Sequence, residues 1–239
     1  HKSGMSDITQ QQFDNWRIIQ RRLQDKKLLQ GKNAAVSVRI PGGDQCWFAP
    51  ATEQSPELAT ITTTSETGDQ TSDDSLWLHQ WLYAQRTDIS AIVSASGEYG
   101  AYLARLSALP DAMSAHKGKA HKNAGMPGIF DEQVRHLGIM PAPANNLKQA
   151  SSALQSNGNL AVLFGQNIVM GMTANRLILN AELFEKSAKA YVLAAATGGQ
   201  IKQLPWLVRF FANRRLLKDQ KRAREAIAMG RLPDESRGY

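Results

Sequence analysis

Two short apolar segments, Leu160-Ala-Val-Leu-Phe164 and Asn167-Ile-Val-Met170, stand on either side of Gly165-Gln166. Apolar runs of this length separated by a turn residue are typical of two strands joined in a hairpin. A long helical pattern follows over residues 173–196 and is ended by Gly198-Gly199. Because a hairpin requires antiparallel pairing, this stretch disfavours a doubly wound parallel sheet.

The rest of the chain contains further short strands and helices. The turn sequence Pro-Gly-Gly-Asp at residues 41–44 separates an alternating strand from an apolar one, which predicts another hairpin. Upstream, large apolar residues recur at the intervals of three and four that place them on one face of a helix: Phe13, Trp16, Ile19 and Leu23. We expect helices over 8–30, 76–85, 97–106, 145–155 and 206–229, and strands over 35–40, 45–48, 58–63 and 89–93. This order of elements predicts a layered α/β domain.

Positive charge is concentrated at one end of the chain of 239 residues, whose net charge is +7. From Lys202 onward there are ten basic and four acidic residues, whereas the first 201 residues hold 18 and 17. We therefore expect one domain over residues 5–201 and a basic helical extension over 202–239 that packs on it. Residues 1–4 are expected to be a cloning remnant.

The extension has two alternative interpretations. Its basic residues are suited to contact an anionic polymer such as nucleic acid, or acidic lipid, but the simpler interpretation is a solvated helix face. Its start is apolar, and we expect these side chains to be buried against the domain or a neighbouring subunit: Trp206, Leu207, Phe210 and Phe211.

The single cysteine and the hydropathy of the chain indicate the cellular compartment of the protein. Cys46 has no intrachain partner, which favours a reducing cytoplasm, and its apolar surroundings favour a buried inert thiol over a nucleophile. No run of residues approaches the roughly 18 apolar residues of a membrane span. The sequence therefore predicts a cytoplasmic protein without a membrane span.

Three stretches, taken in order, resemble the class II aldolase/adducin family over roughly residues 10–200. The first is Ser75-Leu-Trp-Leu-His-Gln-Trp-Leu-Tyr83, followed by Arg86-Thr-Asp88 and Ala91-Ile-Val93. The second is the hairpin over 159–171, and the third is the helix over 181–190. The resemblance implies a three-layer α/β/α fold with a mainly antiparallel central sheet.

In catalytic members of that family three histidines hold a divalent metal, typically zinc, and a nearby carboxylate moves the proton. By position the histidines fall on Ser94, Ser96 and Gly165, and the acid falls on Ser75. The family's phosphate-binding loops fall on Ala34-Ala-Val-Ser37 and Ala49-Pro-Ala-Thr52 and keep only Ser37 and Pro50. Serine and glycine do not replace imidazole as zinc ligands. The resemblance therefore implies no metal, no cofactor and no confident catalytic or phosphate-binding residue.

Two function hypotheses remain open. The first is a non-catalytic oligomeric binding or scaffolding module, a tetramer by family resemblance, with a small-molecule or protein partner. The second is an enzyme with altered, metal-independent chemistry, similar to an aldehyde lyase or epimerase, acting on a small sugar phosphate or keto acid. Its candidate residues are Asp74, Glu98 and His79.

Each of these candidates also has a structural interpretation. Asp73 and Asp74 are suited to cap the helix that begins near Ser75, and His79 to pack on its helix. His116 and His121 stand among lysines, which disfavour a cation, so a solvated or phosphate-contacting loop is the alternative to a replacement metal site.

Overall fold

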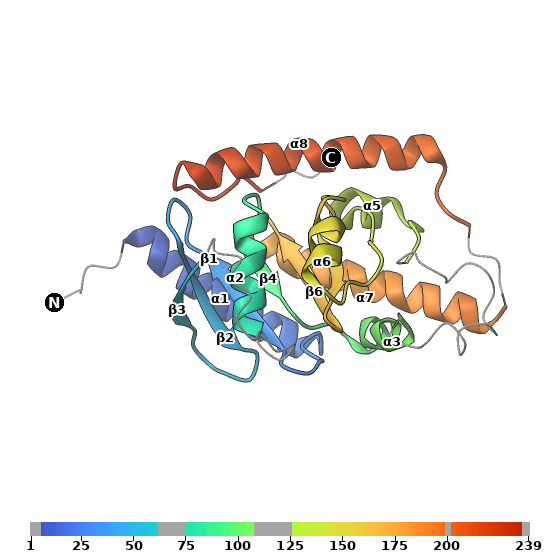
Figure 1. Ribbon diagram of the computed structural model, residues 1–239, viewed down its shortest axis with the longest axis horizontal. Coiled ribbons are helices and arrows are strands. Elements are labelled where there is room, and N and C mark those ends of the chain that lie inside the picture. Colours follow the sequence, from blue (N-terminus) through green and yellow to red (C-terminus); the bar gives the residue numbers. More distant parts are fainter. Residues whose placement is uncertain (1–5, 62–74, 108–125, 199–201, 236–239) are drawn as a thin grey trace.

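The computed structural model describes residues 6–61, 75–107, 126–198 and 202–235 (Figure 1). The expectations for residues 1–4, Asp73, Asp74, His116 and His121 lie outside these ranges. The described strands form one six-stranded sheet in the order β3-β2-β1-β4-β6-β5, with every neighbouring pair antiparallel. Their bounds are β1 Ala35–Arg39, β2 Gln45–Pro50, β3 Glu57–Thr60, β4 Ala91–Val93, β5 Leu160–Leu163 and β6 Gln166–Gly171.

Both predicted hairpins are confirmed, with one change in the second. The β5–β6 loop is Phe164-Gly165 and not Gly165-Gln166, because Gln166 already pairs with Leu163. Phe164 and Gly165 both have positive φ, 52° and 75°. Two successive left-handed residues form the type I′ turn that matches the twist of a two-residue hairpin. The glycine accepts this conformation without strain, whereas the phenylalanine is held in it by the pairing on both sides.

Helices cover both faces of the sheet, so the three-layer α/β/α arrangement is confirmed (Figure 1). One face carries α1 (Asp7–Asp25), α3 (Glu98–Ser107) and α7 (Ala174–Ala196). The other carries α2 (Ser75–Gln85) and α6 (Leu147–Leu154). The strand alternation explains the two cores: Ala91 and Val93 of β4 face the first layer, and Ile92 between them faces the second.

Two helices lie outside this plan. The short α5 (Asp131–Leu137), which the sequence analysis does not predict, contacts α7, and α8 (Trp206–Ala228) lies across α5 along one side of the molecule (Figure 1). The side chains that α8 buries recur every three or four residues: Ala212, Leu216, Gln220, Ala223 and Ile227. The two alanines on this stripe let the helix approach closely, and Leu216 and Ile227 pack between its neighbours.

The apolar start of α8 is not on that stripe. Trp206, Leu207 and Phe211 are 64%, 58% and 59% exposed, and Phe210 is exposed too. The expectation that these residues are buried against the chain's own domain is therefore wrong. The stripe begins at Ala212, and the helical period turns the residues before it toward solvent. Burial against a neighbouring subunit remains a prediction.

Candidate functional site

The positions that the sequence analysis selects gather at one end of the sheet. Ser94 and Ser96 directly follow β4, Ser75 begins α2, and Gly165 lies in the β5–β6 turn. The Ser75 hydroxyl donates to the carbonyl of Asn33 at 2.7 Å and, more weakly, to Gln166 Oε1 at 3.4 Å. These contacts join the start of α2 to the start of β6.

Ser96 is held by the residue next to Gln166. Its hydroxyl accepts a hydrogen bond from Asn167 Nδ2 at 2.9 Å and donates to the Gly97 carbonyl at 3.1 Å. Its peptide pairs with that of Gln30 in an isolated bridge. Asn167 is buried, and its Oδ1 has no hydrogen-bond partner among the described residues. An acceptor without a partner in this position is energetically costly unless something donates to it.

His79 links two of the selected serines through the interior. Its Nδ1 lies 2.6 Å from Ser37 Oγ and its Nε2 lies 2.9 Å from Ser94 Oγ. Ser37 Oγ lies in turn 2.8 Å from the Tyr83 hydroxyl. The Phe48 ring packs edge-on against the imidazole at 5.3 Å. All three hydroxyls and the imidazole are buried, so the chain Tyr83–Ser37–His79–Ser94 crosses between α2, β1 and the end of β4.

The direction of these hydrogen bonds follows from the donors available. Ser94 Oγ also lies 3.4 Å from the Ala35 carbonyl, which can only accept. If Ser94 donates there, His79 Nε2–H donates to Ser94, Ser37 donates to Nδ1, and Tyr83 donates to Ser37. Every proton in the chain then has an acceptor. The opposite direction leaves the buried Tyr83 hydroxyl proton without one among these contacts, so the Nε2–H tautomer is favoured.

Burial determines the charge state of this chain. Desolvation lowers the pKa of His79 to about 3 and raises that of Tyr83 well above its usual value. His79 is therefore a neutral imidazole near pH 7, with both nitrogens engaged. This favours the packed interpretation of His79 over a solvent-accessible general base.

Glu98, the other described candidate base, is exposed at the first residue of α3. The carboxylate that reaches the start of this helix belongs to Glu185 of α7, which accepts from the backbone of Tyr99 at 2.8 Å and of Gly100 at 3.1 Å. A Cβ on Gly97 would overlap the Glu185 carboxylate, so a larger residue there would displace this carboxylate from the helix start. Glu185 thus stabilises the N-terminus of α3, a role that required knowledge of the α3–α7 contact.

The described donors at this end of the sheet do not fit a zinc ion. Ser94 and Ser96 offer hydroxyls that are hydrogen-bonded within the chain, and the described residues contain no group of three His, Cys, Asp or Glu able to hold a metal. Ser37 is likewise committed to His79 and Tyr83 inside β1, so its hydroxyl is not directed at a phosphate.

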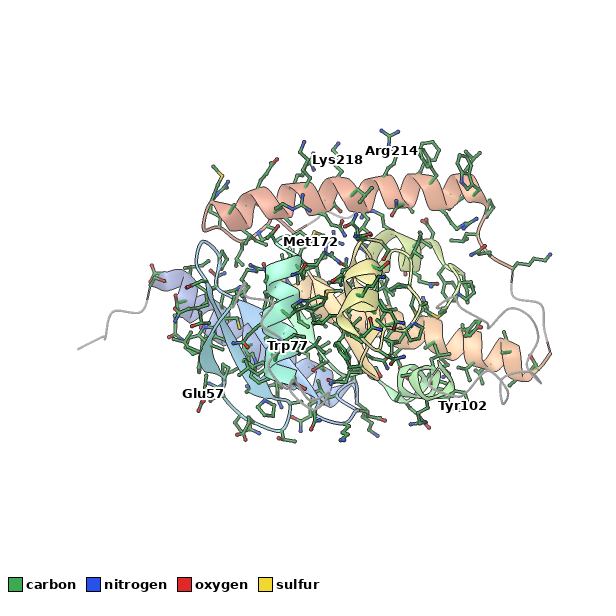
Figure 2. All side chains as sticks on the ribbon, in the orientation of Figure 1. Glu57, Trp77, Tyr102, Met172, Arg214 and Lys218 are labelled. Atoms are coloured by element: carbon green, nitrogen blue, oxygen red, sulfur yellow. The ribbon has the colours of Figure 1, made fainter. Side chains whose placement is uncertain are left out.

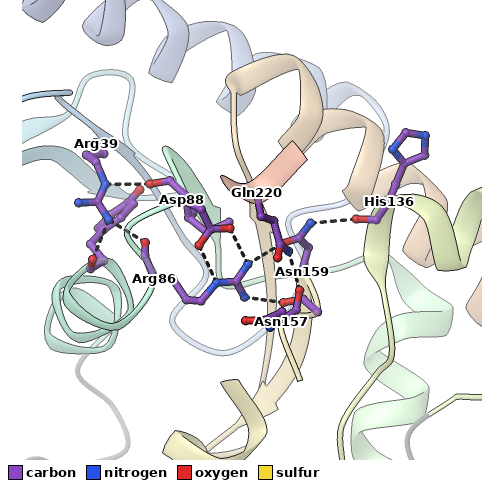
Figure 3. A network of polar contacts seen from close by, with 10 residues as sticks. Arg39, Arg86, Asp88, His136, Asn157, Asn159 and Gln220 are labelled. Atoms are coloured by element: carbon purple, nitrogen blue, oxygen red, sulfur yellow. Dashed lines mark hydrogen bonds and ion pairs between the residues drawn. The ribbon is translucent and has the colours of Figure 1, made fainter. Parts of the chain in front are cut away.

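A second polar network fixes the turn that leads into β4 (Figure 3). Arg86 forms a buried two-pronged ion pair with Asp88 at 2.9 Å and donates to the Gly158 carbonyl and to Asn159 Oδ1. Arg39 donates to the carbonyls of Tyr83, Arg86 and Ile89. The bidentate pair holds the turn after α2 in shape, and the bonds from Arg86 to Gly158 and Asn159 tie this turn to the loop before β5. The guanidinium groups of Arg39 and Arg86 donate to groups of the chain itself.

The chain matches no family model and no curated protein sequence, but its fold is shared by solved structures. YgbL from Klebsiella pneumoniae, a candidate aldolase, epimerase or decarboxylase, is 18% identical at a TM-score of 0.63, covering 87% of this chain and 100% of that one. The aldolase II superfamily protein from Pseudomonas syringae is 13% identical at a TM-score of 0.62, covering 96% of this chain and 98% of that one. L-fuculose-1-phosphate aldolase from Thermus thermophilus is 14% identical at a TM-score of 0.55, covering 82% of this chain and 100% of that one.

These similarities establish that the chain has the class II aldolase fold, as the sequence resemblance implied. At such low identity they establish the fold alone. The helices of the described chain include none that is both long and apolar enough to cross a bilayer.

Proposed function

We propose that this chain is a non-catalytic class II aldolase-fold protein that acts as an oligomeric binding or scaffolding module in the cytoplasm. The observation that carries the proposal is the state of Ser94, whose buried hydroxyl is bonded to a neutral, fully buried His79. By the family resemblance Ser94 takes the place of a metal-binding imidazole. Here the position serves the hydrogen bonding of the core.

The neighbouring positions support the same proposal. Ser96 is bonded to Asn167, Ser75 is bonded to a backbone carbonyl, and Gly165 has no side chain and lies in a tight turn. Losing a single ligand is compatible with a displaced metal site. Losing all three imidazoles and the acid removes the family's metal ligands and its proton carrier from these four positions.

Elemental analysis of the purified protein tests the proposal directly. We expect far less than one zinc or other transition metal per chain, and no cleavage of fuculose- or ribulose-type phosphates above a mock preparation. Replacing Ser94 by alanine should lower the free energy of unfolding and leave the absence of turnover unchanged. About one metal per chain, or turnover that Ser94→Ala abolishes, would overturn the proposal. Light scattering on the intact protein separately tests for the expected tetramer.

One observation favours the alternative, a metal-independent lyase-like or epimerase-like activity on a small sugar phosphate or keto acid. Asn167 Oδ1 is buried, unpaired and next to Ser96. A ligand hydroxyl donating to that oxygen would satisfy it. A thermal-shift screen of polyols, sugar phosphates and keto acids decides between the two. An enzyme of this kind should be stabilised by its substrate in wild type but not in Asn167→Ala, and should turn it over, whereas a binding module should show stabilisation at most.

A further inference from the structure

The long helix α8 is held firmly along one side of the fold. Asp219 on its flank accepts from Arg135 of α5 at 2.8 Å and from Arg176 of α7 at 3.2 Å. Gln220 donates to the Asn157 carbonyl at 2.6 Å, and a Cβ on Gly138 would meet Leu216 at 3.0 Å. These contacts fix the rotation of the helix about its own axis, so the same face always points outward.

The outward face carries basic residues along its length. Spacings of four and three residues from Leu207 place one line of side chains opposite the buried stripe: Leu207, Phe211, Arg214, Lys218, Lys221 and Glu225. Arg214 and Lys218 point away from the rest of the molecule (Figure 2). Arg215, Arg222 and Arg224 are exposed beside this line, while Glu225 is the one exposed acid among the described residues of the helix.

The N-terminal end of the same face is apolar and aromatic. Trp206 and Phe210 stack at 5.4 Å, Phe211 meets Phe210 edge-on at 5.6 Å, and the Arg214 guanidinium lies 5.8 Å above the Phe210 ring. Leu207 and Val208 are exposed in the same turn. A cluster of exposed tryptophan, phenylalanine and aliphatic side chains is unusual on a surface that contacts only water.

We propose that α8 lies on an anionic membrane surface, with Trp206, Leu207, Phe210 and Phe211 entering the headgroup region and the basic line contacting acidic headgroups. Aromatic and aliphatic anchors beside lysine and arginine are the chemistry by which helices lie in a membrane interface without crossing it. The interface places the indole and phenyl groups where both water and hydrocarbon are within reach.

Two other occupants fit the same face less well. Symmetric pairing with a second copy along the whole of this face would bring its basic residues against those of the other copy, which is unfavourable. Single-stranded nucleic acid binds by stacking bases on open ring faces. Here the stack of Trp206 on Phe210 takes up one face of each ring, Arg214 lies over Phe210, and the exposed Leu207 and Val208 add nothing to stacking.

Sedimentation of the full chain with vesicles tests the proposal, using pure phosphatidylcholine and phosphatidylcholine mixed with phosphatidylserine. The charge variant is Arg214→Gln/Lys218→Gln/Lys221→Gln, and the aromatic variant is Trp206→Ala/Phe210→Ala/Phe211→Ala. The control, Arg17→Gln/Arg21→Gln/Arg22→Gln, removes the same charge from exposed positions of α1. All replaced residues of α8 are exposed, and circular dichroism confirms that each variant is folded.

We expect binding to the anionic vesicles only, reduced on the order of a hundredfold in the charge variant and far less in the control. The aromatic variant should lose the binding that persists at high salt. Tryptophan fluorescence should shift to the blue on vesicles in wild type but not in Trp206→Phe.

Several results would overturn the proposal. The first is an absence of vesicle binding. The second is equal binding by wild type and the aromatic variant, which would indicate electrostatic adsorption alone. The third is preferential binding of a single-stranded oligonucleotide that vesicles do not displace. The fourth is a smaller gel-filtration size in the aromatic variant without any vesicle binding, which would identify the patch as a subunit contact.

Discussion

The helices α2 and α8 are both rich in aromatic residues, but α2 buries most of them whereas α8 leaves them exposed. In α2, Trp81 and Tyr83 are buried, and the histidine between the tryptophans is buried with them. In α8, Trp206, Phe210 and Phe211 are exposed, and the buried stripe is made of alanine, leucine, isoleucine and glutamine side chains. Local hydrophobicity alone would have buried both.

The difference follows from what each helix packs against. α2 lies on the sheet without any Lys, Arg, Asp or Glu in its sequence, so more than one side of it can be buried. α8 touches the fold along one narrow stripe, and its position is fixed by Asp219 and Gln220 at the contact. Only the residues that recur every three or four positions on this stripe are buried, whatever side chains lie elsewhere on the helix.

The largest expected effect on stability comes from replacing the buried histidine of α2. In His79→Ala, Ser37 and Ser94 each lose a hydrogen-bond partner in a site from which water is excluded, and a cavity remains. We expect the free energy of unfolding to fall by about 3–5 kcal/mol. Urea denaturation measures it.

Gln85→Ala serves as the control on the same helix, since Gln85 is exposed at its last residue. The free energy of unfolding of this variant should differ from wild type by no more than about 0.5 kcal/mol. A His79→Ala variant as stable as Gln85→Ala would mean that the buried chain of hydroxyls contributes little to the fold.

Two neighbouring leucines of α8 test the stripe directly. Leu216 is 1% exposed and Leu217 is 40% exposed. Leu216→Ala should cost about 2–4 kcal/mol through lost burial and an unfilled cavity, and Leu217→Ala no more than about 0.5 kcal/mol. Paired urea titrations compare them under one set of conditions. Equal losses would show that the helix is rotated or detached in solution.

The buried histidine should also make stability depend on pH. Because the pKa of His79 is about 3 in the folded chain and about 6.5 when unfolded, the unfolded state binds more protons in between. Stability is therefore full above pH 6.5 and falls as pH decreases toward 3, by about 2 kcal/mol between pH 7 and pH 5. Burial lowers the pKa of His136 to about 4, which acts in the same direction.

Unfolding curves at pH 5 and pH 7, for wild type and for His79→Gln, measure this contribution. The glutamine variant cannot titrate at this position, so its loss of stability on acidification should be smaller by that amount. An identical pH dependence in both proteins would place the titrating group elsewhere.

The sequence predicted the elements whose signal is local and missed those decided by distant contacts. The turn glycines and strand alternation were sufficient for both hairpins, and helical periodicity for α1 and α7. The seven-residue α5 escaped notice because it is too short to show a period. The partners of His79 come from residues 15 and 42 positions away, so no local pattern connects them. The side of α8 that docks is set by α5 and α7, and for that reason the expectation that its aromatic start is buried against its own domain was wrong.

The smallest expected effect concerns that aromatic start, and it separates the single chain from an assembly. In a dilute, monomeric sample Phe211→Ala should change the free energy of unfolding by no more than about 0.5 kcal/mol, since Phe211 is 59% exposed and lies opposite the buried stripe. Its matched control is Ala212→Ser, which places a hydroxyl on the buried stripe next to it and should cost more. If Phe211 is buried between subunits instead, its replacement should lower the melting temperature increasingly as protein concentration rises, because association stabilises the folded state by mass action. A concentration-independent loss of more than about 1 kcal/mol in Phe211→Ala would contradict both cases, since it would require this ring to be buried within its own chain.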